Sequence, residues 1–363
     1  MTLLLFFVIL AVLVLVHEAG HFFVAKFFKI RVDEFGFGFP PRLFSVHRGE
    51  TRYSFNLIPF GGFVKIFGED QTEEIKDGEA SRNFSRKHRG VQALVLVAGI
   101  VGNFLLAWIL ISAGFMVGLP APAGEEWGLP VTDAALTVVE VLPDSPASRA
   151  GLRAGDTVIS FSQNGRALEN PSPDFASEFI AETKSGAIDV AVKRGTKLLS
   201  FSVEPSSEVL EGRPAIGIAM DMLGTVRLPI HRAVLEGAKT TVFLSVEVSR
   251  ALALFIKDAF AGAADIKNLA GPVGIAGLVG DARAQGVAPL LSLTALISIN
   301  LALINLIPFP ALDGGRLLFV AIEAVRRKPI PAKIAQYANA TGFFILFLFL
   351  VFITYHDIAR LFN

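Results

Sequence analysis

Residues 14–23 read VLVHEAGHFF, and the pattern H-E-x-x-H in this stretch closes an almost purely apolar run that begins at residue 3. On a helix, His17 and His21 lie one turn apart on the same face, so both imidazoles can bind one metal ion. Glu18 is the next residue round the helix, where it can reach a water on that ion without being a ligand. The pattern is typical of a zinc site with an adjacent general base.

The surroundings of this motif are those of a membrane-spanning helix. From residue 3 to residue 28, Lys26 is the only ionisable residue outside the motif,. Each charged group near a bilayer centre costs roughly 2.5–3.5 kcal/mol on insertion scales, and a bound cation relieves that cost. The alternative is that the pattern is accidental and that the histidines lie at the membrane interface.

Composition points to several such spans. The chain has 363 residues, of which 52% are hydrophobic, more than a soluble globular chain needs,. Its formal net charge of zero gives no argument for nucleic-acid binding, and the absence of cysteine excludes a disulfide framework and thiol catalysis,. The first segment lacks a basic start and a small-residue cleavage site before His17, so we interpret it as a retained span and not a signal peptide.

The apolar runs predict four membrane-spanning helices, at residues 3–28, 91–119, 289–307 and 341–355,. The connections at residues 29–90 and 326–333 are rich in Lys and Arg, and such loops stay cytoplasmic,. Both termini and the long polar segment at residues 120–229 are then predicted to be extracytoplasmic. His17 lies near the inner end of the first span.

Residues 32–67 are rich in Phe, Gly and Pro, and short alternating runs around the turn at residues 47–50 predict β-hairpins,. So many exposed aromatic side chains would be a liability in water. Two interpretations stay open. The hairpins either dip into the membrane beside the motif, or form a small cytoplasmic β-domain with its own core.

The polar segment at residues 120–229 contains one recognisable module. Residues 136–141 read as a strand, and residues 143–160 look like the short helix, turn and strand of a PDZ domain. Ile216, Gly217 and Ile218 have the small-apolar pattern of a peptide-binding edge. PDZ domains capture chain ends or extended peptides by strand addition. The alternative is a β-domain that only spaces or shields the spans.

Residues 231–265 read as a helix that is too polar for a span and fits the outer interface of the membrane,. Residues 271–276 are predicted to break the helical pattern before the third span. The fold class is therefore a polytopic α-helical membrane protein with four transmembrane helices, a membrane-associated β-hairpin region and one extracytoplasmic PDZ domain. The predicted domains are residues 1–119, 120–229, 230–288 and 289–363.

A candidate third ligand follows the third span. Two prolines break the helix, and Pro310 and the pair Gly314-Gly315 force a turn from which Asp313 can project back toward the spans,. The charge topology places Asp313 at the same membrane face as the two histidines. Two His and one carboxylate with an open fourth position form a catalytic zinc shell, which lowers the pKa of a water to about 7. The alternative is that Asp313 only caps a helix on the inner surface.

These motifs together resemble the site-2 protease family of intramembrane zinc metalloproteases, in particular the bacterial regulator-of-sigma-E protease type that cleaves membrane-bound anti-sigma factors. The resemblance covers nearly the whole chain: the H-E-x-x-H motif, the Gly-Phe-Gly-x-Pro stretch at 36–40, residues 58–65, the Ala98-Gly99-x-x-x-Asn103-Phe104 pattern, the PDZ-like module, residues 271–275 and residues 305–314. The best-known members carry two PDZ domains and longer termini, whereas this chain shows one such module.

The resemblance implies that His17, His21 and Asp313 bind Zn²⁺ and that Glu18 is the general base. It implies that Asn305 and the hairpin near Phe63 and Val64 hold an unwound substrate. The implied function is regulated intramembrane proteolysis of single-span membrane proteins, such as anti-sigma factors or signal-peptide remnants. The implied place is the bacterial cytoplasmic membrane, with a PDZ domain that restricts entry.

Two other functional classes compete with this interpretation. A metal transporter also uses intramembrane His and Asp, but it predicts polar residues in the fourth span, and residues 343–352 contain none,. An inactive scaffold that uses its PDZ domain as an adaptor would not need Glu18 beside two intact histidines.

Overall fold

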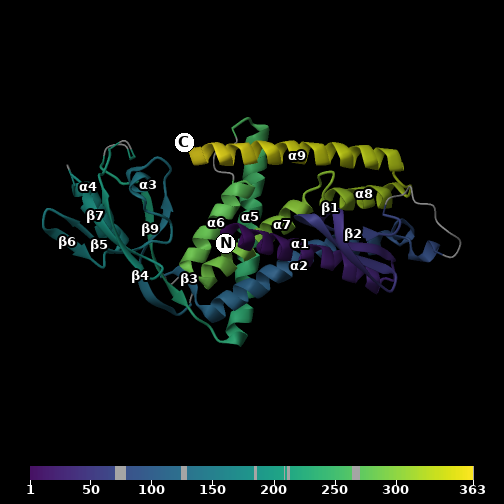
Figure 1. Cartoon of the computed structure of the whole chain (residues 1–363), viewed down its shortest axis with the longest axis horizontal. Coiled ribbons are helices and arrows are strands. Elements are labelled where there is room, and N and C mark those ends of the chain that lie inside the picture. Colours follow the sequence, from purple (N-terminus) through teal and green to yellow (C-terminus); the bar gives the residue numbers. More distant parts are fainter. Residues whose placement is uncertain are drawn as a thin grey trace. The chain divides into compact units, whose positions relative to one another are not determined.

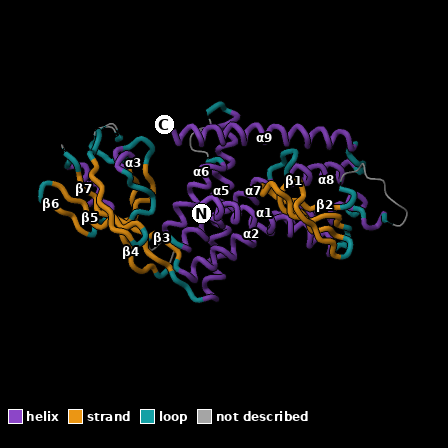
Figure 2. The backbone as a smooth tube through the Cα atoms, in the orientation of Figure 1, coloured by secondary structure: helices purple, strands orange, loops and turns teal. Residues whose placement is uncertain are grey.

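The computed structural model describes residues 1–69, 79–123, 129–183, 186–207, 209–210, 213–263 and 270–362. They form two compact units. Unit 1 comprises residues 1–112, 234–280 and 293–363, and unit 2 comprises residues 113–233 and 281–292. Figure 1 labels the elements, and Figure 2 shows that the strands belong to two separate sheets.

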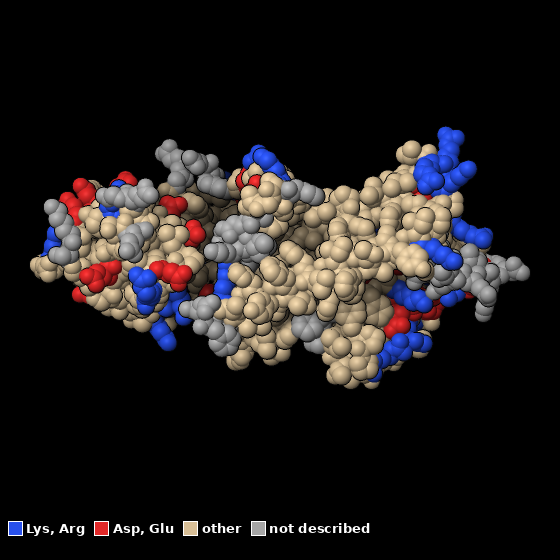
Figure 3. Space-filling view, turned by 90° about the horizontal axis from the view of Figure 1, so that it is seen from above, with Lys and Arg blue, Asp and Glu red and all other residues tan. Residues whose placement is uncertain are grey.

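Four helices are long and apolar enough to cross a membrane: α1 (Thr2–Phe27), α2 (Arg89–Val117), α7 (Val287–Leu306) and α9 (Ala332–Phe362). They confirm the four predicted spans, and α9 begins nine residues before the predicted start at residue 341. On the face shown in Figure 3, the helical surface of unit 1 carries few charged side chains. Such a surface suits a lipid environment, in which each exposed charge is costly.

The predicted hairpin is present in unit 1. Strands β1 (Val32–Arg48) and β2 (Thr51–Ile66) pair as an antiparallel two-stranded sheet. The pairing is irregular. The backbone of Phe35 pairs with both Tyr53 and Val64, so residues 34–37 of β1 lie between two separate stretches of β2. Within the described residues no strand pairs with the far side of residues 62–64, so that stretch is an open edge.

The base of this hairpin shares a core with the helices. Buried side chains from α1, β1, β2, α2, α8 (Asp313–Arg326) and the segments that connect them form one cluster: Ala25, Ile30, Val32, Ile66, Phe84, Val95, Leu96 and Val320. Leu43, Phe44 and Val46 near the tip of the hairpin are exposed. The packing therefore fixes the position of β2 against α1, while the tip presents apolar side chains outward.

Unit 2 is a seven-stranded sheet with two short helices. The strand order is β3-β9-β4-β5-β7-β8, with β6 paired to β5. The elements are β3 (Leu119–Pro122), β4 (Val131–Val141), α3 (Pro146–Ala150), β5 (Thr157–Gln163), β6 (Arg166–Glu169), α4 (Pro173–Glu182), β7 (Ile188–Arg194), β8 (Lys197–Val203) and β9 (Ile218–Val226). Ser145 caps α3, and Gly151 ends it in a left-handed conformation,. The strand, helix and strand predicted from residues 136–160 are all present.

The remaining helices correct the sequence analysis in one place and add to it in another. Helices α5 (Ile230–Phe260) and α6 (Pro272–Gln285) follow β9 in the chain, and the short 3-10 helices η1 (Ala80–Arg82) and η2 (Phe84–Arg86) precede α2. The break predicted at residues 271–276 is misplaced, because residues 270–271 are not helical but α6 already begins at Pro272. The Asp357 carboxylate accepts hydrogen bonds from the backbone N–H groups of Gly271 (3.2 Å) and Gly274 (2.8 Å), which caps that helix,. Residues 313–326, to which the sequence analysis assigned no element, form the amphipathic helix α8.

Candidate metal centre

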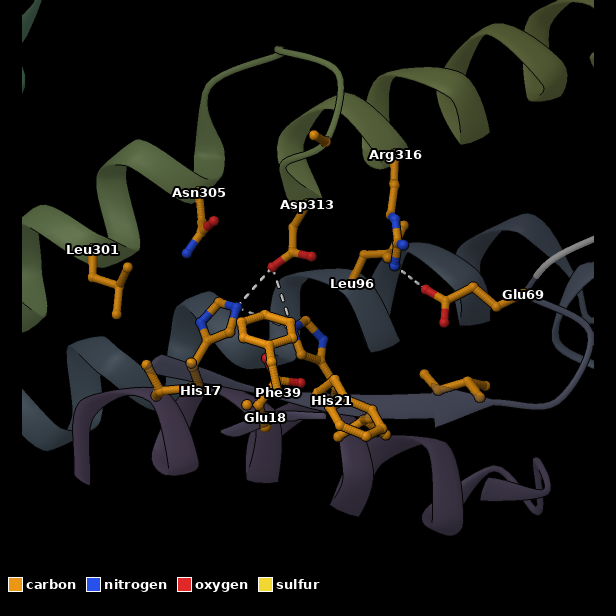
Figure 4. A pocket seen from close by; sticks show the side chains of 17 residues that line it. His17, Glu18, His21, Phe39, Glu69, Leu96, Leu301, Asn305, Asp313 and Arg316 are labelled. Atoms are coloured by element: carbon orange, nitrogen blue, oxygen red, sulfur yellow. Dashed lines mark hydrogen bonds and ion pairs between the residues drawn. The ribbon is translucent and has the colours of Figure 1, made fainter. Parts of the chain in front are cut away.

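Three side chains from two distant parts of the chain converge in unit 1. His17 and His21 are buried on α1, and Asp313 is the first residue of α8. The Oδ2 atom of Asp313 lies 2.9 Å from Nε2 of His17 and 3.2 Å from Nε2 of His21, and the two Nε2 atoms are 3.2 Å apart. Figure 4 shows the three groups facing one another. Among the described residues, this is a group of His and carboxylate ligand atoms that could hold one metal ion.

The spacing of these atoms fits zinc. Ligands about 2.0 Å from a tetrahedral ion lie about 3.3 Å from one another, close to the three distances above. Two imidazole nitrogens and one carboxylate oxygen also match the ligand types of catalytic zinc sites, which keep a further position open. The geometry therefore brings together all three residues for which the sequence predicts a metal-binding role.

The protonation of the ligands suits the same ion. The Nδ1 atom of His21 lies 2.8 Å from the carbonyl oxygen of Val95, so Nδ1 donates to that oxygen and Nε2 is the nitrogen that faces Asp313,. Burial alone would raise the pKa of Asp313, but hydrogen bonds from His17 and His21 outweigh it and lower the pKa overall. Asp313 is thereby ionised, as a metal-binding carboxylate must be.

The turn before α8 explains how Asp313 reaches the histidines. A Cβ atom on Gly314 would lie 2.2 Å from the carbonyl oxygen of Ile307, so the chain can fold this tightly only with glycine,. Ala311 adopts a positive φ of 76°, and its backbone N–H donates to Oδ1 of Asn339 on α9 (3.2 Å). The prolines and glycines that predicted a turn therefore form one, and α9 supports it.

Glu18 opens onto the same space. A cavity of about 480 Å³ is lined by the three candidate ligands, Glu18 and residues of β2 and α7. Of the predicted substrate-binding residues, Asn305, Phe63 and Val64 line this cavity. Ile216, Gly217 and Ile218 lie in unit 2 and are not among its lining residues. Figure 4 shows Asn305 and Asp313 on one side of the cavity and Glu18 among the histidines on the other.

Four residues near the ligands received no role from the sequence. Arg316 of α8 forms an ion pair with Glu69 at the edge of the cavity. Gly99 and Asn103 of α2 lie directly behind the imidazoles. The sequence did contain one indication that Gly99 and Asn103 act together. They are four residues apart, about one helical turn, which places both on one face of α2.

We expect Gly99→Ala to weaken zinc binding roughly 10–100-fold, the range typical of lost support around ligands. A Cβ atom at this position would lie 2.3 Å from Nε2 of His21 and 2.9 Å from Cε1 of His17, so the imidazoles must move. Competition against a chromophoric chelator measures the affinity. Gly277→Ala on α6 is the control, because a Cβ atom there meets nothing within 4 Å. Unchanged affinity in Gly99→Ala would contradict the packing described.

Comparison with known proteins agrees with this geometry. The model of Peptidase family M50 matches residues 5–349. The chain is 35% identical to a candidate zinc metalloprotease of Clostridium perfringens over 95% of each chain. It is 32% identical to a candidate zinc metalloprotease of a Nostoc species, over 97% of this chain and 94% of the relative. It is 30% identical to the regulator of sigma-W protease RasP of Bacillus subtilis, over 99% of each chain. The chain belongs to peptidase family M50.

Proposed function

We propose that this protein is an intramembrane zinc endopeptidase that cleaves the transmembrane segments of other membrane proteins. The observation that carries the proposal is the convergence of His17, His21 and Asp313 beside Glu18, on a helix apolar enough to span a membrane. Relatives that are similar over nearly the whole chain are named zinc metalloproteases. The relative named as a regulator of sigma-W protease supports regulatory membrane proteins, such as anti-sigma factors, as the substrate class.

In this proposal His17, His21 and Asp313 hold Zn²⁺, which supplies Lewis-acid activation of a carbonyl group and of water. Glu18 lines the same cavity, and it takes a proton from the attacking water and passes it to the leaving amine,. The water oxygen bonds to the carbonyl carbon as the C–N bond breaks, so the products are a carboxylate and an amine. The amide of Asn305, which also lines the cavity, is placed to bind the substrate backbone.

The hairpin can supply the backbone hydrogen-bond partners that a membrane-spanning substrate needs once its helix unwinds. A membrane-spanning helix hides its carbonyl groups in its own hydrogen bonds, so the substrate must unwind locally and then needs new backbone partners. Residues 62–64 have no second strand partner within the described part of the chain, and Phe63 and Val64 line the cavity. We infer that an extended substrate adds to this edge beside Glu18.

The four apolar helices and the bacterial relatives indicate a multi-pass bacterial membrane protein. We propose the finer topology from charge: the termini and unit 2 lie outside the cytoplasmic membrane, and the metal site lies near its inner face. The ion pairs of Glu50 with Lys26 and Arg82 support this proposal, because they gather charge where α1 meets the hairpin turn. Attachment of a membrane-impermeant label to single introduced cysteines tests each placement.

Cleavage of a single-span substrate by the purified protein in liposomes tests the activity. We expect cleavage to stop with a zinc chelator and to return when Zn²⁺ is added. A transporter would move metal across the same liposomes without cutting the substrate, and an inactive scaffold would do neither. Intact substrate at every zinc concentration would contradict the proposed function.

We also propose that unit 2 is a PDZ domain that controls which substrates enter. Residues 218–221 of β9 pair with β4 on one side, and within the described residues no strand pairs with their other side; α4 packs against β9. The Gly217 carbonyl accepts a hydrogen bond from the backbone N–H of Leu142 (2.9 Å), which holds the start of this edge. Ile216, Gly217 and Ile218 would then contact an added peptide.

Deletion of residues 130–220 is expected to change substrate choice without loss of hydrolysis. The pairs that join residues 119–122 to residues 223–226 survive this deletion, so the chain ends remain held together. We expect a short span peptide to be cut as before, and a substrate with a bulky outer domain to be cut faster. Both substrates are compared in the liposome assay. Loss of activity on the short peptide would contradict a gating role.

A further inference from the structure

The side chain of Asn103 is a buried polar group that the mechanism above does not use. Asn103 lies on α2 with 0% of its surface exposed, and its Nδ2 atom is 3.3 Å from Nδ1 of His17. Its Oδ1 atom has no hydrogen-bond partner among the described residues. A buried amide oxygen without a hydrogen-bond partner costs free energy, and it costs more within a membrane-spanning helix. A polar group kept there despite this cost is a candidate for a functional role.

The chemistry of His17 sets what Asn103 must do. Nε2 of His17 is the atom that faces Asp313 and His21, so it is the nitrogen that binds a metal. A neutral imidazole that binds through Nε2 carries its proton on Nδ1, and that N–H needs an acceptor. His21 has such an acceptor in the Val95 carbonyl oxygen, 2.8 Å from its Nδ1. For His17 the corresponding neighbour is the amide of Asn103.

Only one end of that amide can accept. With Nδ2 toward His17, the amide donates to Nδ1, which puts the imidazole proton on Nε2 and blocks metal binding. With the amide rotated by half a turn, Oδ1 accepts from Nδ1–H and the Nε2 lone pair is free for the metal. Amide oxygen and nitrogen have nearly the same shape, so both orientations fit the same space.

We propose that Asn103 is the positioning residue that selects the metal-binding tautomer of His17, through an amide that turns its oxygen to Nδ1 when zinc binds. This inference rests on the metal site of the proposed function. It extends a general feature of zinc sites, in which the second nitrogen of a histidine ligand donates to a fixed acceptor. Here the acceptor comes from the neighbouring span, so it also ties the packing of α2 to the metal.

Three variants test the proposal. Asn103→Leu keeps the approximate size of the side chain but removes the acceptor, and we expect zinc affinity to fall roughly 10–100-fold. Asn103→Asp keeps an acceptor and adds negative charge, so we expect it to bind zinc at least as tightly as the unsubstituted protein. Ser298→Ala is the matched control. It removes the hydrogen bond from Ser298 Oγ to the backbone oxygen of the same Asn103 (2.8 Å) and leaves the amide in place.

The measurements are zinc affinity by chelator competition, the unfolding temperature without metal, and the nitrogen NMR signals of histidine-labelled protein. We expect Asn103→Leu to lose affinity with little change in metal-free stability and with His17 no longer held as the Nδ1–H form. Asn103→Leu with unchanged affinity, or Asn103→Asp as weak as Asn103→Leu, would overturn the proposal. If Asn103→Leu does not fold, the test rests on Asn103→Asp. Tenfold weaker zinc binding by Asn103→Asp is then enough to overturn the proposal. Failure of the unsubstituted protein to bind zinc would instead refute the metal site itself.

Discussion

Glu18→Gln is expected to keep its zinc and to lower the rate of peptide hydrolysis roughly 10²–10⁴-fold, the usual contribution of a positioned acid–base group. The amide has nearly the shape of the carboxylate, so the packing of α1 against β2 near Gly62 is preserved. It cannot take a proton from water, however, and it cannot return one to the leaving amine. The three ligand atoms come from other residues, so metal content should not change.

Two measurements on the same preparation check this prediction: zinc per chain by elemental analysis, and cleavage of a single-span substrate in liposomes. Glu69→Gln is the matched control, because Glu69 lines the same cavity and loses the same charge. Its carboxylate is paired with Arg316 and not placed among the histidines, so a smaller loss is expected. If Glu18→Gln cleaves as fast as the unsubstituted protein, another group is the base.

The local parts of this site could be predicted because helix geometry fixes them. Residues four apart on a helix share a face, so the spacing of His17 and His21 was sufficient to place two imidazoles together. Asp313 is 296 residues from His17, and periodicity cannot connect them. Its place could be predicted because the basic loops set the topology and because proline and glycine next to it force a turn.

The parts that the sequence did not reveal depend on packing between elements. Gly99 and Asn103 form a visible spacing on α2, but only the structure shows that this face lies behind the imidazoles. The double pairing of residues 34–37 is likewise a property of the folded hairpin, because alternation predicts strands and not their partners,. Helix α8 received no assignment because the two glycines in its first turn obscure the start of the helical pattern,.

Asp313→Ala is expected to remove zinc and activity together. Structural zinc sites in peptides bind with about 10–16 kcal/mol, so one ligand of four accounts for roughly 3 kcal/mol, or a loss near 10²-fold in affinity. The loss is larger if the histidines move once the carboxylate that contacts both Nε2 atoms is gone. Asp313→Asn keeps the shape of the side chain and the start of α8, so it isolates the effect of the charge.

The decisive comparison is between this ligand and the base. Zinc affinity and cleavage should fall in parallel for Asp313→Ala and Asp313→Asn, and cleavage should recover in part when free zinc is raised. Glu18→Gln should show no such recovery, because its metal is already bound. Asp258→Asn, an exposed carboxylate on α5, is the control for loss of an acidic group. Full zinc occupancy in Asp313→Ala would mean that the carboxylate near the histidines is not a ligand, and the cavity around Glu18 would then need another third donor.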